Sequence, residues 1–497
     1  MKVLALLSLF LLALRVPAAQ NQDTAVARQI ASQVSQPRFA AALWGIKIVS
    51  LDSGKTLFET NAEKLFSPAS NAKLFTTALA LDRLGPDFRI KTSLYAAGRP
   101  DAAGTLTGDL VVYGRGDPCI NARLHEGDLD KALEPLVAGL ISQGVKRITG
   151  DVVGDDSFFH GAPFGSGWAV DDLQYYYGAE VSALTINDNV LDLSVRAGSE
   201  AGAPTRVTLV PAAGFLTISN RARTESKESV RKIELTHPVG ENIIDVSGTI
   251  SVGGADFRET ITFHDPAMAF AWFLKEGLAR KGIEVVGKPV SRHWSPGSPA
   301  FDPAIQVEVG SMESLPMRDL IREVLKPSQN LYADLLLAQV GAKFASSTRI
   351  NESTEDSGIR ALDKFAVEAG VRKGSLLFEE GSGLSRNNLV TPEAVVRLLQ
   401  FMNKHRSGRD YYDALPVAGV DGTLRTRMKK TAAEGKVHAK TGSLRWANSL
   451  SGFVTAPGGD HLAFSLILNR YQASEASHSA RTELDAIAVL LAGGIAE

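Results

Sequence analysis

The sequence of 497 residues has only one cysteine, Cys119, and nine histidines. A single cysteine cannot form an internal disulfide, so a folded chain of this size has to be stabilised by its hydrophobic core. Cys119 is either a small buried residue or a reactive thiol, and burial is the commoner role of a free cysteine. The histidines are scattered, with no pair at metal-ligand spacing. The sequence therefore predicts no metal site and no cofactor.

An excess of charge of one sign is also missing. Lysine and arginine number 53 against 55 aspartates and glutamates, which gives a formal net charge of −2. Such a balance gives no electrostatic reason to expect nucleic acid as a partner. With 44% hydrophobic and 22% charged residues, the composition is that of an ordinary globular protein. The length indicates two or three domains.

Long hydrophobic runs are absent except at the N-terminus. Met1-Lys2 precedes an almost uninterrupted apolar stretch at 3–14, and Val16-Pro17-Ala18-Ala19 is a small-residue site that suits cleavage after Ala18 or Ala19. This pattern predicts a signal peptide at 1–19 and export to the periplasm or the extracellular cell-wall space. An uncleaved anchor is the alternative, but the run is short against the about 20 residues that span a bilayer. We expect membrane association to be peripheral at most.

Periodicity predicts a split domain with an insertion. At the N-terminal end we expect a helix at 23–34, strands at 44–51 and 56–59, and a helix after Ser70. Helices are expected again at 316–325, 331–337, 358–369, 391–405 and 475–491, and strands at 436–441, 450–455 and 462–468. Because neither part looks complete alone, residues 20–90 and 300–497 are assigned to one α/β domain. Residues 91–299, where short strand-like segments alternate with Gly, Asp and Pro turns, are interpreted as a β-rich insertion of two small domains.

The first chemical motif is Ser70-x-x-Lys73 at the start of the predicted helix. Residues three apart on a helix lie on one face, so Ser70 Oγ and Lys73 Nζ can meet. A serine hydroxyl becomes a nucleophile when a neighbour accepts its proton, and a lysine does so when its pKa is lowered. The spacing alone is weak evidence, because Ser229-x-x-Lys232 repeats it in a charged run that we interpret as a solvated strand or loop.

Two further motifs follow. Ser328-Gln329-Asn330 lies between two predicted helices, where the serine hydroxyl can relay a proton and the asparagine amide can orient a lysine. Ser385-Arg386-Asn387 has the same spacing. Loop capping is the simpler role for either copy. Lys440-Thr441-Gly442-Ser443 follows a predicted strand. There Lys440 supplies positive charge, Gly442 permits the close approach of a ligand, and the Thr441 and Ser443 hydroxyls can bind a carboxylate.

The three motifs in this order resemble the penicillin-recognising serine enzymes. The separation of Ser70 from Ser328 leaves room for the insertion, and the chain is similar to class C low-molecular-mass penicillin-binding proteins, the D-alanyl-D-alanine carboxypeptidase/endopeptidase family. Supporting stretches lie at 108–118, 177–184, 381–388 and 415–424. The resemblance implies an α/β sandwich of the serine β-lactamase type, with an antiparallel central sheet, helices on both faces and a large β-rich insertion. It also places Arg115-Gly116-Asp117 in a shared turn, which argues against an adhesion motif.

The resemblance implies a mechanism and partners. Ser70 would attack the penultimate D-Ala carbonyl of peptidoglycan peptides ending in D-Ala-D-Ala, with Lys73 as base. Ser328, Asn330 and Lys440 would complete the catalytic set, Thr441, Gly442 and Ser443 would bind substrate, and β-lactam antibiotics would be covalent inhibitors. Asp155, Phe159 and Arg386 match positions that contact the third peptide residue in relatives. Arg445 departs from the family pattern, and either binds a substrate carboxylate or forms a salt bridge with Asp155.

Two functions of other classes remain open at this point. One is a hydrolase of different specificity, a β-lactamase or esterase, which rapid deacylation of a β-lactam would reveal. The other is a non-catalytic peptidoglycan-binding protein, with which three intact motifs agree poorly. The sequence leaves the balance between carboxypeptidase and endopeptidase action undetermined.

Overall fold

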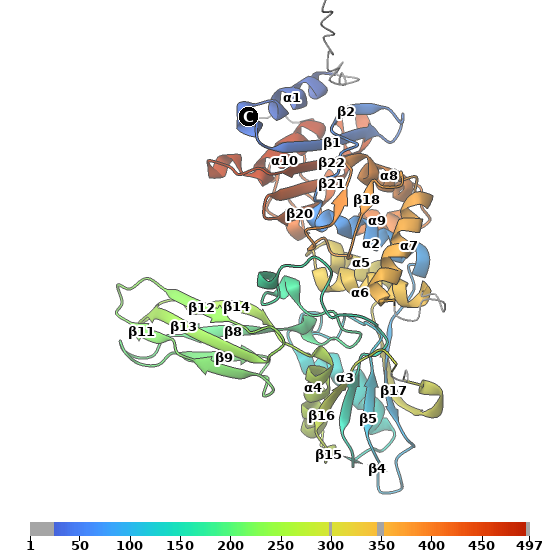
Figure 1. The fold of residues 1–497 in the computed structure, drawn as a ribbon, viewed down its shortest axis with the longest axis vertical. Helices are drawn as coiled ribbons and strands as arrows, with labels where there is room; N and C mark the ends of the chain where they lie inside the picture. Colours follow the sequence, from blue (N-terminus) through green and yellow to red (C-terminus); the bar gives the residue numbers. More distant parts are fainter. Residues whose placement is uncertain (1–23, 298–300, 345–351, 494–497) are drawn as a thin grey trace, which may run out of the picture.

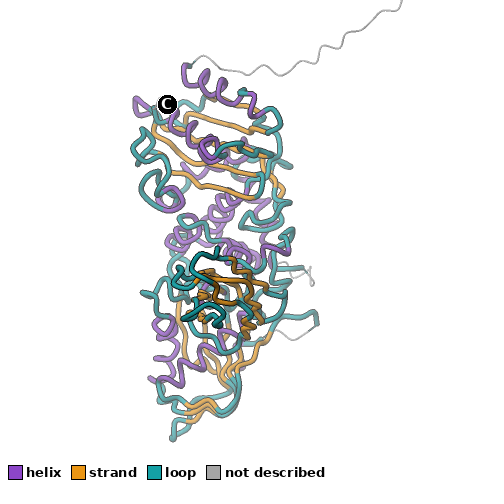
Figure 2. The backbone as a smooth tube through the Cα atoms, turned by 90° about the vertical axis from the view of Figure 1, so that its left-hand side faces the viewer, coloured by secondary structure: helices purple, strands orange, loops and turns teal. Residues whose placement is uncertain are grey.

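The computed structural model describes residues 24–297, 301–344 and 352–493, so the predicted signal peptide at 1–19 lies outside the described residues. The molecule is elongated (Figure 1), with one sheet at each end, helices between them and a β-rich arm that projects from the middle. The view from the side keeps the same stacking order (Figure 2), with the arm pointing toward the viewer.

A five-stranded antiparallel sheet joins the two terminal parts of the chain. Its order is β2-β1-β22-β21-β20. The strands are β1 (Leu43–Ser50), β2 (Thr56–Thr60), β20 (Val437–Leu444), β21 (Ala447–Thr455) and β22 (His461–Asn469). β1 pairs with β22 over its whole length, from Leu43 opposite Asn469 to Ser50 opposite Leu462. Segments from opposite ends of the sequence therefore build one sheet.

Helices cover both faces of this sheet. On one face, α1 (Ala25–Val34) and α10 (Ala480–Leu491) close one hydrophobic core. On the other face, a second core is formed with α2 (Ala72–Leu84), α5 (Met317–Leu325), α6 (Asn330–Phe344), α7 (Thr354–Glu368), α8 (Pro392–Asn403) and α9 (Gly408–Ala414). An antiparallel sheet between helical layers confirms the predicted α/β sandwich. The β-rich insertion predicted with it is also present, in the sheets described next.

The second five-stranded sheet has the order β16-β7-β5-β3-β17 and packs against α3 (Leu129–Ser142) and α4 (Pro266–Arg280). Its strands are β3 (Lys91–Ala96), β5 (Leu110–Tyr113), β7 (Val152–Asp155), β16 (Pro289–Arg292) and β17 (Val307–Glu313). β17 follows residue 300 and pairs with β3. The chain therefore returns to the helices of the first sheet at α5.

Smaller sheets complete the β-rich region. The arm in Figure 1 consists of β8 (Val190–Arg196), β9 (Arg206–Val210), β10 (Thr217–Asn220), β11 (Arg223–Glu225), β12 (Lys232–Thr236), β13 (Ile243–Ser251) and β14 (Phe257–Thr262). The remaining strands are β4 (Thr105–Leu106), β6 (Arg147–Ile148) and β15 (Glu284–Val285), which form a sheet, and the pair β18 (Leu376–Leu377) and β19 (Leu389–Val390).

Within the described ranges, no helix combines the length and the apolar character that a membrane crossing requires.

Candidate active site

Ser70 lies in a 3₁₀ turn, Ala69–Asn71, directly before α2. Lys73 Nζ donates a hydrogen bond to Ser70 Oγ at 3.0 Å. The preceding Ala69 has a φ of +48°, a left-handed conformation that is uncommon for a residue with a side chain and is found most often at functional sites. The structure therefore brings together the two side chains that the sequence predicts as nucleophile and base.

The environment of Lys73 favours the neutral form of its amine. Its side chain is fully buried, and Nζ also donates to Asn330 Oδ1 and to the Ser382 carbonyl oxygen, both at 2.6 Å. Burial disfavours the ammonium form and lowers the pKa of Lys73 to about 8, although the carboxyls of Glu380 and Asp334 act in the opposite direction. A fraction of Lys73 is therefore neutral near pH 7 and can accept the Ser70 proton.

Ser328 and Asn330 lie where α5 gives way to α6. Ser328 has a φ of +68°, and its Oγ accepts a hydrogen bond from Lys440 Nζ at 2.7 Å. Asn330, the first residue of α6, accepts from Lys73 through Oδ1 and donates from Nδ2 to the Tyr177 carbonyl oxygen at 2.8 Å. The amide thus orients Lys73 on one side and fixes the Tyr177 segment on the other.

Lys440 projects from β20 and is fully buried. Besides Ser328, its Nζ bonds the carbonyl oxygen of Thr441 at 2.8 Å. Burial, followed by repulsion from Lys73, holds the pKa of Lys440 well below its usual range. The sequence predicted a positive charge here, but two buried neighbouring ammonium groups are costly, so the surroundings favour a neutral amine.

Gly442 allows β20 to approach the Ser70 turn. A Cβ at this position would lie 2.5 Å from the Pro68 carbonyl oxygen and 2.2 Å from Ser449 Oγ, which is far too close. Ser449 Oγ itself donates to the Pro68 carbonyl oxygen at 2.6 Å. The sequence assigned this glycine to the approach of a ligand, whereas the described contacts that require it come from the protein's own backbone and from Ser449.

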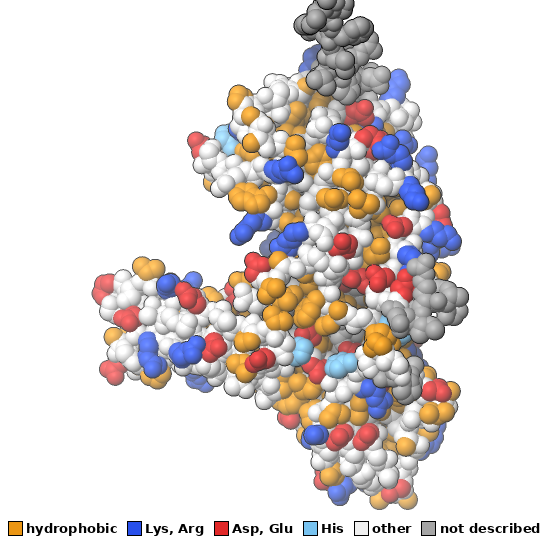
Figure 3. Space-filling view, in the orientation of Figure 1, with side chains coloured by type: hydrophobic (Ala, Val, Ile, Leu, Met, Phe, Trp, Pro, Cys, Tyr) orange, Lys and Arg blue, Asp and Glu red, His pale blue; other side chains and the backbone are white. Residues whose placement is uncertain are grey.

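The motifs meet at a cleft of about 890 Å³. Ser70, Ser328, Asn330, Thr441 and Ser443 all line it. The space-filling view shows the molecule hollowed between the arm and the upper body (Figure 3), with basic side chains on the upper wall and acidic ones on the lower wall. A cleft of this volume is in the range that encloses a small peptide or drug-sized ligand.

Arginines and aspartates give the cleft charges of both signs; they are Asp171, Asp172, Arg386, Arg427, Arg445 and Arg481. Arg386 donates to both carboxylate oxygens of Asp172, at 2.6 and 3.2 Å, so this pair is bidentate. Arg427 pairs with Asp485. Asp171 and Arg445 are exposed.

Sequence reasoning missed Asp171, Asp172 and the tyrosines beside them, Tyr176 and Tyr177, which also line the cleft. The sequence signal that could have indicated them is a cluster of polar and aromatic residues, in which two aspartates at 171–172 are followed closely by three consecutive tyrosines at 175–177.

Asp155 and Phe159 lie elsewhere. The Asp155 carboxyl is fully buried, where it accepts hydrogen bonds from Ser157 Oγ at 2.6 Å and from Arg292 Nη1 at 3.1 Å. Phe159 packs against Gly116 and lines a different cavity. The structure therefore does not bring these two residues to the cleft, and the nearby acid that pairs with Arg386 is Asp172.

The simpler interpretations of four other sequence features agree with the structure. Ser385 Oγ accepts a hydrogen bond from the Asn387 N–H at 3.2 Å, which is a loop cap. Val230, inside the second Ser-x-x-Lys, is 85% exposed. Cys119 is buried, and burial raises the pKa of its thiol, so it is not a reactive thiolate. Asp117 is 1% exposed, which excludes an accessible adhesion tripeptide.

Comparison with known proteins gives extensive matches. A family model described as D-Ala-D-Ala carboxypeptidase 3 (S13) matches residues 26–491. The D-alanyl-D-alanine carboxypeptidase of Actinomadura sp. (strain R39) is 33% identical over 487 residues, covering 94% of this chain and 85% of that protein. The D-alanyl-D-alanine carboxypeptidase DacB of Haemophilus influenzae is 27% identical, covering 86% of this chain and 85% of that protein.

A solved structure is similar over nearly the whole chain. The crystal structure of penicillin binding protein 4 (dacB) from Haemophilus influenzae matches with a TM-score of 0.79 and 25% sequence identity, covering 93% of this chain and 98% of that chain. A second crystal structure of that protein, complexed with a β-lactam, matches with a TM-score of 0.74 and 24% identity, covering 94% of this chain and 98% of that one.

Proposed function

The chain belongs to the D-Ala-D-Ala carboxypeptidase 3 (S13) family, and from this premise we propose that Ser70 forms an acyl-enzyme with peptidoglycan stem peptides that end in D-Ala-D-Ala. The protein is a serine-type carboxypeptidase of the penicillin-binding class. The observation that carries the proposal is the hydrogen bond of 3.0 Å between Ser70 Oγ and a fully buried lysine whose pKa is lowered to about 8.

In the proposed acylation step, Ser70 Oγ bonds to the carbonyl carbon of the penultimate D-Ala while Lys73 takes its proton. The bond from that carbon to the nitrogen of the terminal D-Ala then breaks. Ser328 relays to the leaving amine the proton that Lys73 has taken from Ser70, while Lys440 Nζ donates a hydrogen bond to Ser328 Oγ at 2.7 Å. The backbone N–H groups of Ser70 and Ser443 would hold the oxyanion, an effect of about 3–4 kcal/mol per donor in enzymes of this kind.

In the proposed deacylation step, water attacks the same carbonyl carbon and releases the shortened peptide, with Ser70 Oγ recovering its proton. Asn330 would hold the amide of the acyl side. A β-lactam resembles the D-Ala-D-Ala end, but its leaving amine remains tethered after ring opening. That amine would block the path of water and keep the adduct on Ser70.

Brief exposure of the mature protein to benzylpenicillin tests this proposal. We expect one stable covalent adduct in the intact mass, and peptide mapping should locate it on the fragment that contains Ser70. Rapid conversion of the antibiotic to penicilloate without a lasting adduct would instead identify a β-lactamase. An unmodified protein with unchanged penicillin would favour a non-catalytic peptidoglycan-binding protein.

The specificity for the third peptide residue is proposed to depend on Arg445. Of the two roles open to this arginine, the salt bridge with Asp155 is disfavoured because Asp155 is fully buried and bonded to Arg292. Arg445 instead lines the cleft and is exposed. Its guanidinium is therefore suited to a carboxylate on the third side chain, while Asp171 is suited to an ammonium on the same side chain.

Replacing Arg445 by glutamine is expected to lower kcat/KM up to about fivefold for a peptide whose third side chain carries a carboxylate, because an exposed ion pair contributes at most about 1 kcal/mol. The measurement is D-Ala release from two peptides that differ only at the third residue, which is diaminopimelate or alanine. Rates with the alanine peptide should not change. As a matched control, R409Q removes an exposed arginine of α9 that does not line the cleft, and should affect neither peptide. Equal losses with both peptides would contradict the assignment.

Export is proposed from the N-terminal sequence. An apolar stretch followed by Val16-Pro17-Ala18-Ala19 is typical of a cleaved signal. A carboxypeptidase that acts on peptidoglycan needs access to the cell-wall space, which agrees with this prediction.

A further inference from the structure

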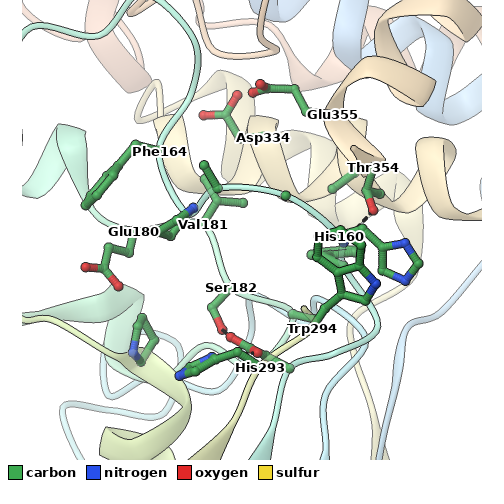
Figure 4. Close-up of a pocket in the computed structure, with 18 of the residues that line it drawn as sticks. His160, Phe164, Glu180, Val181, Ser182, His293, Trp294, Asp334, Thr354 and Glu355 are labelled. Carbon is green, nitrogen blue, oxygen red and sulfur yellow. Dashed lines mark hydrogen bonds and ion pairs between the residues drawn. The ribbon is translucent and has the colours of Figure 1, made fainter. Parts of the chain in front are cut away.

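A second cavity, of about 290 Å³, lies between the helices of the first sheet and the β-rich region. It shares no lining residue with the cleft. Helix α6 connects the two: Asn330 lines the cleft, and Asp334, one turn later, lines the cavity. Figure 4 shows the side chains of Asp334 and Glu355 next to each other on one side of the cavity, with Ser182 and His293 on the opposite side.

Asp334 has a carboxylate oxygen for which the described residues supply no partner. The residue is 3% exposed, and its Oδ1 accepts a hydrogen bond from the Gly381 N–H at 2.9 Å. Its Oδ2 is buried without any hydrogen bond. An unpaired buried carboxyl oxygen has lost its hydration without gaining a partner, so its position at a cavity wall indicates a ligand that supplies a donor.

The ionisable side chains of the lining are mainly acids. Five acids contribute to the lining, Asp156, Glu180, Asp265, Asp334 and Glu355, and among the described lining residues there is neither lysine nor arginine. Two of the three lining histidines already have carboxylate partners, because His293 bonds Asp156 Oδ1 at 2.9 Å and His264 bonds Glu180, while burial lowers the pKa of the third, His160. Asp334 and Glu355 are left with no cation among the lining residues.

Much of the remaining wall is apolar or aromatic, and Ser182 and Thr354 add hydroxyl groups. Phe159, Phe164, Val181 and Ala338 contribute to it, and His160 stacks on Trp294 with ring centroids 4.7 Å apart. Such a lining suits the hydrocarbon part of a ligand, and an indole face attracts a cation.

We propose that this cavity binds a small organic cation, whose ammonium group lies between Asp334 and Glu355 and whose hydrocarbon body lies along Phe164, Val181 and Trp294. The site is separate from the peptide cleft and does not depend on the acyl-enzyme proposed for Ser70.

The protonation of the two acids agrees with this site. Burial raises the pKa of Glu355 to about 8 and that of Asp334 well above its usual range, and the carboxylate of Glu380 reinforces both shifts. A bound ammonium would favour the ionised carboxylates, so binding should release protons and strengthen as the pH rises from about 6 to about 8.5. The other charged groups that face the two acids are Lys73, Asp356 and Glu379, and His264 and His293 lie across the cavity.

Calorimetric titration of the mature protein with hexylamine, 1-hexanol and hexanoate tests the proposal. The three probes share a six-carbon chain and differ in the charge of their head group. Hexylamine should bind at least about tenfold more tightly than hexanol, since a charge-assisted hydrogen bond contributes about 1.5–3 kcal/mol. Hexanoate should not bind. Repeating the titration in buffers of different ionisation enthalpy should show proton release.

Three variants locate the binding. D334N retains the acceptor for the Gly381 N–H and removes the ability to ionise, so it should fold and bind hexylamine at least about tenfold more weakly. A338L should exclude the probe sterically without changing any charged group, provided that its melting temperature is near that of the wild type. D171N, in the cleft, should leave hexylamine binding unchanged.

The following results would overturn the proposal: no hexylamine binding to the wild type, equal binding of hexylamine and hexanol, or full binding by D334N. A loss of binding in D171N equal to that in D334N would move the site to the cleft. Failure of penicillin to acylate Ser70 would leave the cavity proposal intact, because the two readouts are independent.

Discussion

The S70A variant is expected to lose carboxypeptidase activity by a factor on the order of 10⁶, because removal of a catalytic serine eliminates the covalent route altogether. It should also remain unmodified after exposure to benzylpenicillin. Folding should be preserved, since the Ser70 hydroxyl contributes a single hydrogen bond from Lys73, which retains Asn330 and Ser382 as partners. D-Ala release, intact mass and thermal unfolding measure the three expectations.

The chain contains its own matched control. Ser229 and Lys232 repeat the spacing of Ser70 and Lys73, but Val230 between them is 85% exposed, and Ser229 Oγ is bonded to Ser226 Oγ at 3.2 Å. S229A should therefore retain both activity and labelling. If S70A were still labelled by penicillin, Ser70 would not be the nucleophile.

The grouping of Ser70, Lys73, Ser328, Asn330 and Lys440 was predictable from sequence because three motifs of different chemistry had to coincide. Each spacing alone is common, as the second copies at Ser229 and Ser385 show. What the sequence could not supply is the burial of Lys73 and Lys440, which depends on contacts between segments more than two hundred residues apart and sets their pKa values. For the same reason, the sequence predicted a positive charge on Lys440, whereas its burial beside Lys73 lowers the pKa of the amine.

The charged residues of the cleft that lie beyond the three motifs, such as Asp172, were harder to predict. Asp155 was chosen by its position in the chain, but it ends β7, where its side chain is covered by Arg292 of the neighbouring β16. Asp172 ends an isolated 3₁₀ turn, Val170–Asp172, within an otherwise irregular segment, and its carboxylate pairs there with Arg386 from a distant loop. Irregular segments have no periodicity, so sequence patterns do not say which way their side chains point.

Local periodicity identified most regular elements but not their pairing. The segment at 105–113 is strand-like along its whole length, but Gly108, with a φ of +91°, divides it into β4 and β5, which belong to different sheets. The segment at 148–153 is divided likewise between β6 and β7. β17 pairs with β3, a strand that precedes it by more than two hundred residues. Such pairing depends on tertiary packing, which short windows of sequence do not contain.

The K73M variant is expected to acylate with benzylpenicillin about 10³-fold more slowly than the wild type, within the range of 10²–10⁴ typical of a lost general base. Methionine has a similar length and suits a buried site, but it cannot accept the Ser70 proton. In the wild type, only the neutral amine is a base. Since the pKa of Lys73 is about 8, the acylation rate should rise about tenfold per unit as the pH increases toward 8, and level off above it.

The pH profile distinguishes a base from a structural residue. If Lys73 only supported the fold, K73M would lower the rate by a constant factor and keep the rising limb. If Lys73 is the base, the acylation rate of the variant no longer rises as the pH increases toward the Lys73 pKa of about 8. K232M, the matched change at the exposed second motif, should leave both the rate and the profile unchanged. If K73M keeps the wild-type acylation rate and its rise with pH, Lys73 is not the base. The role would then fall to Lys440, the other buried amine, whose Nζ donates to Ser328 Oγ.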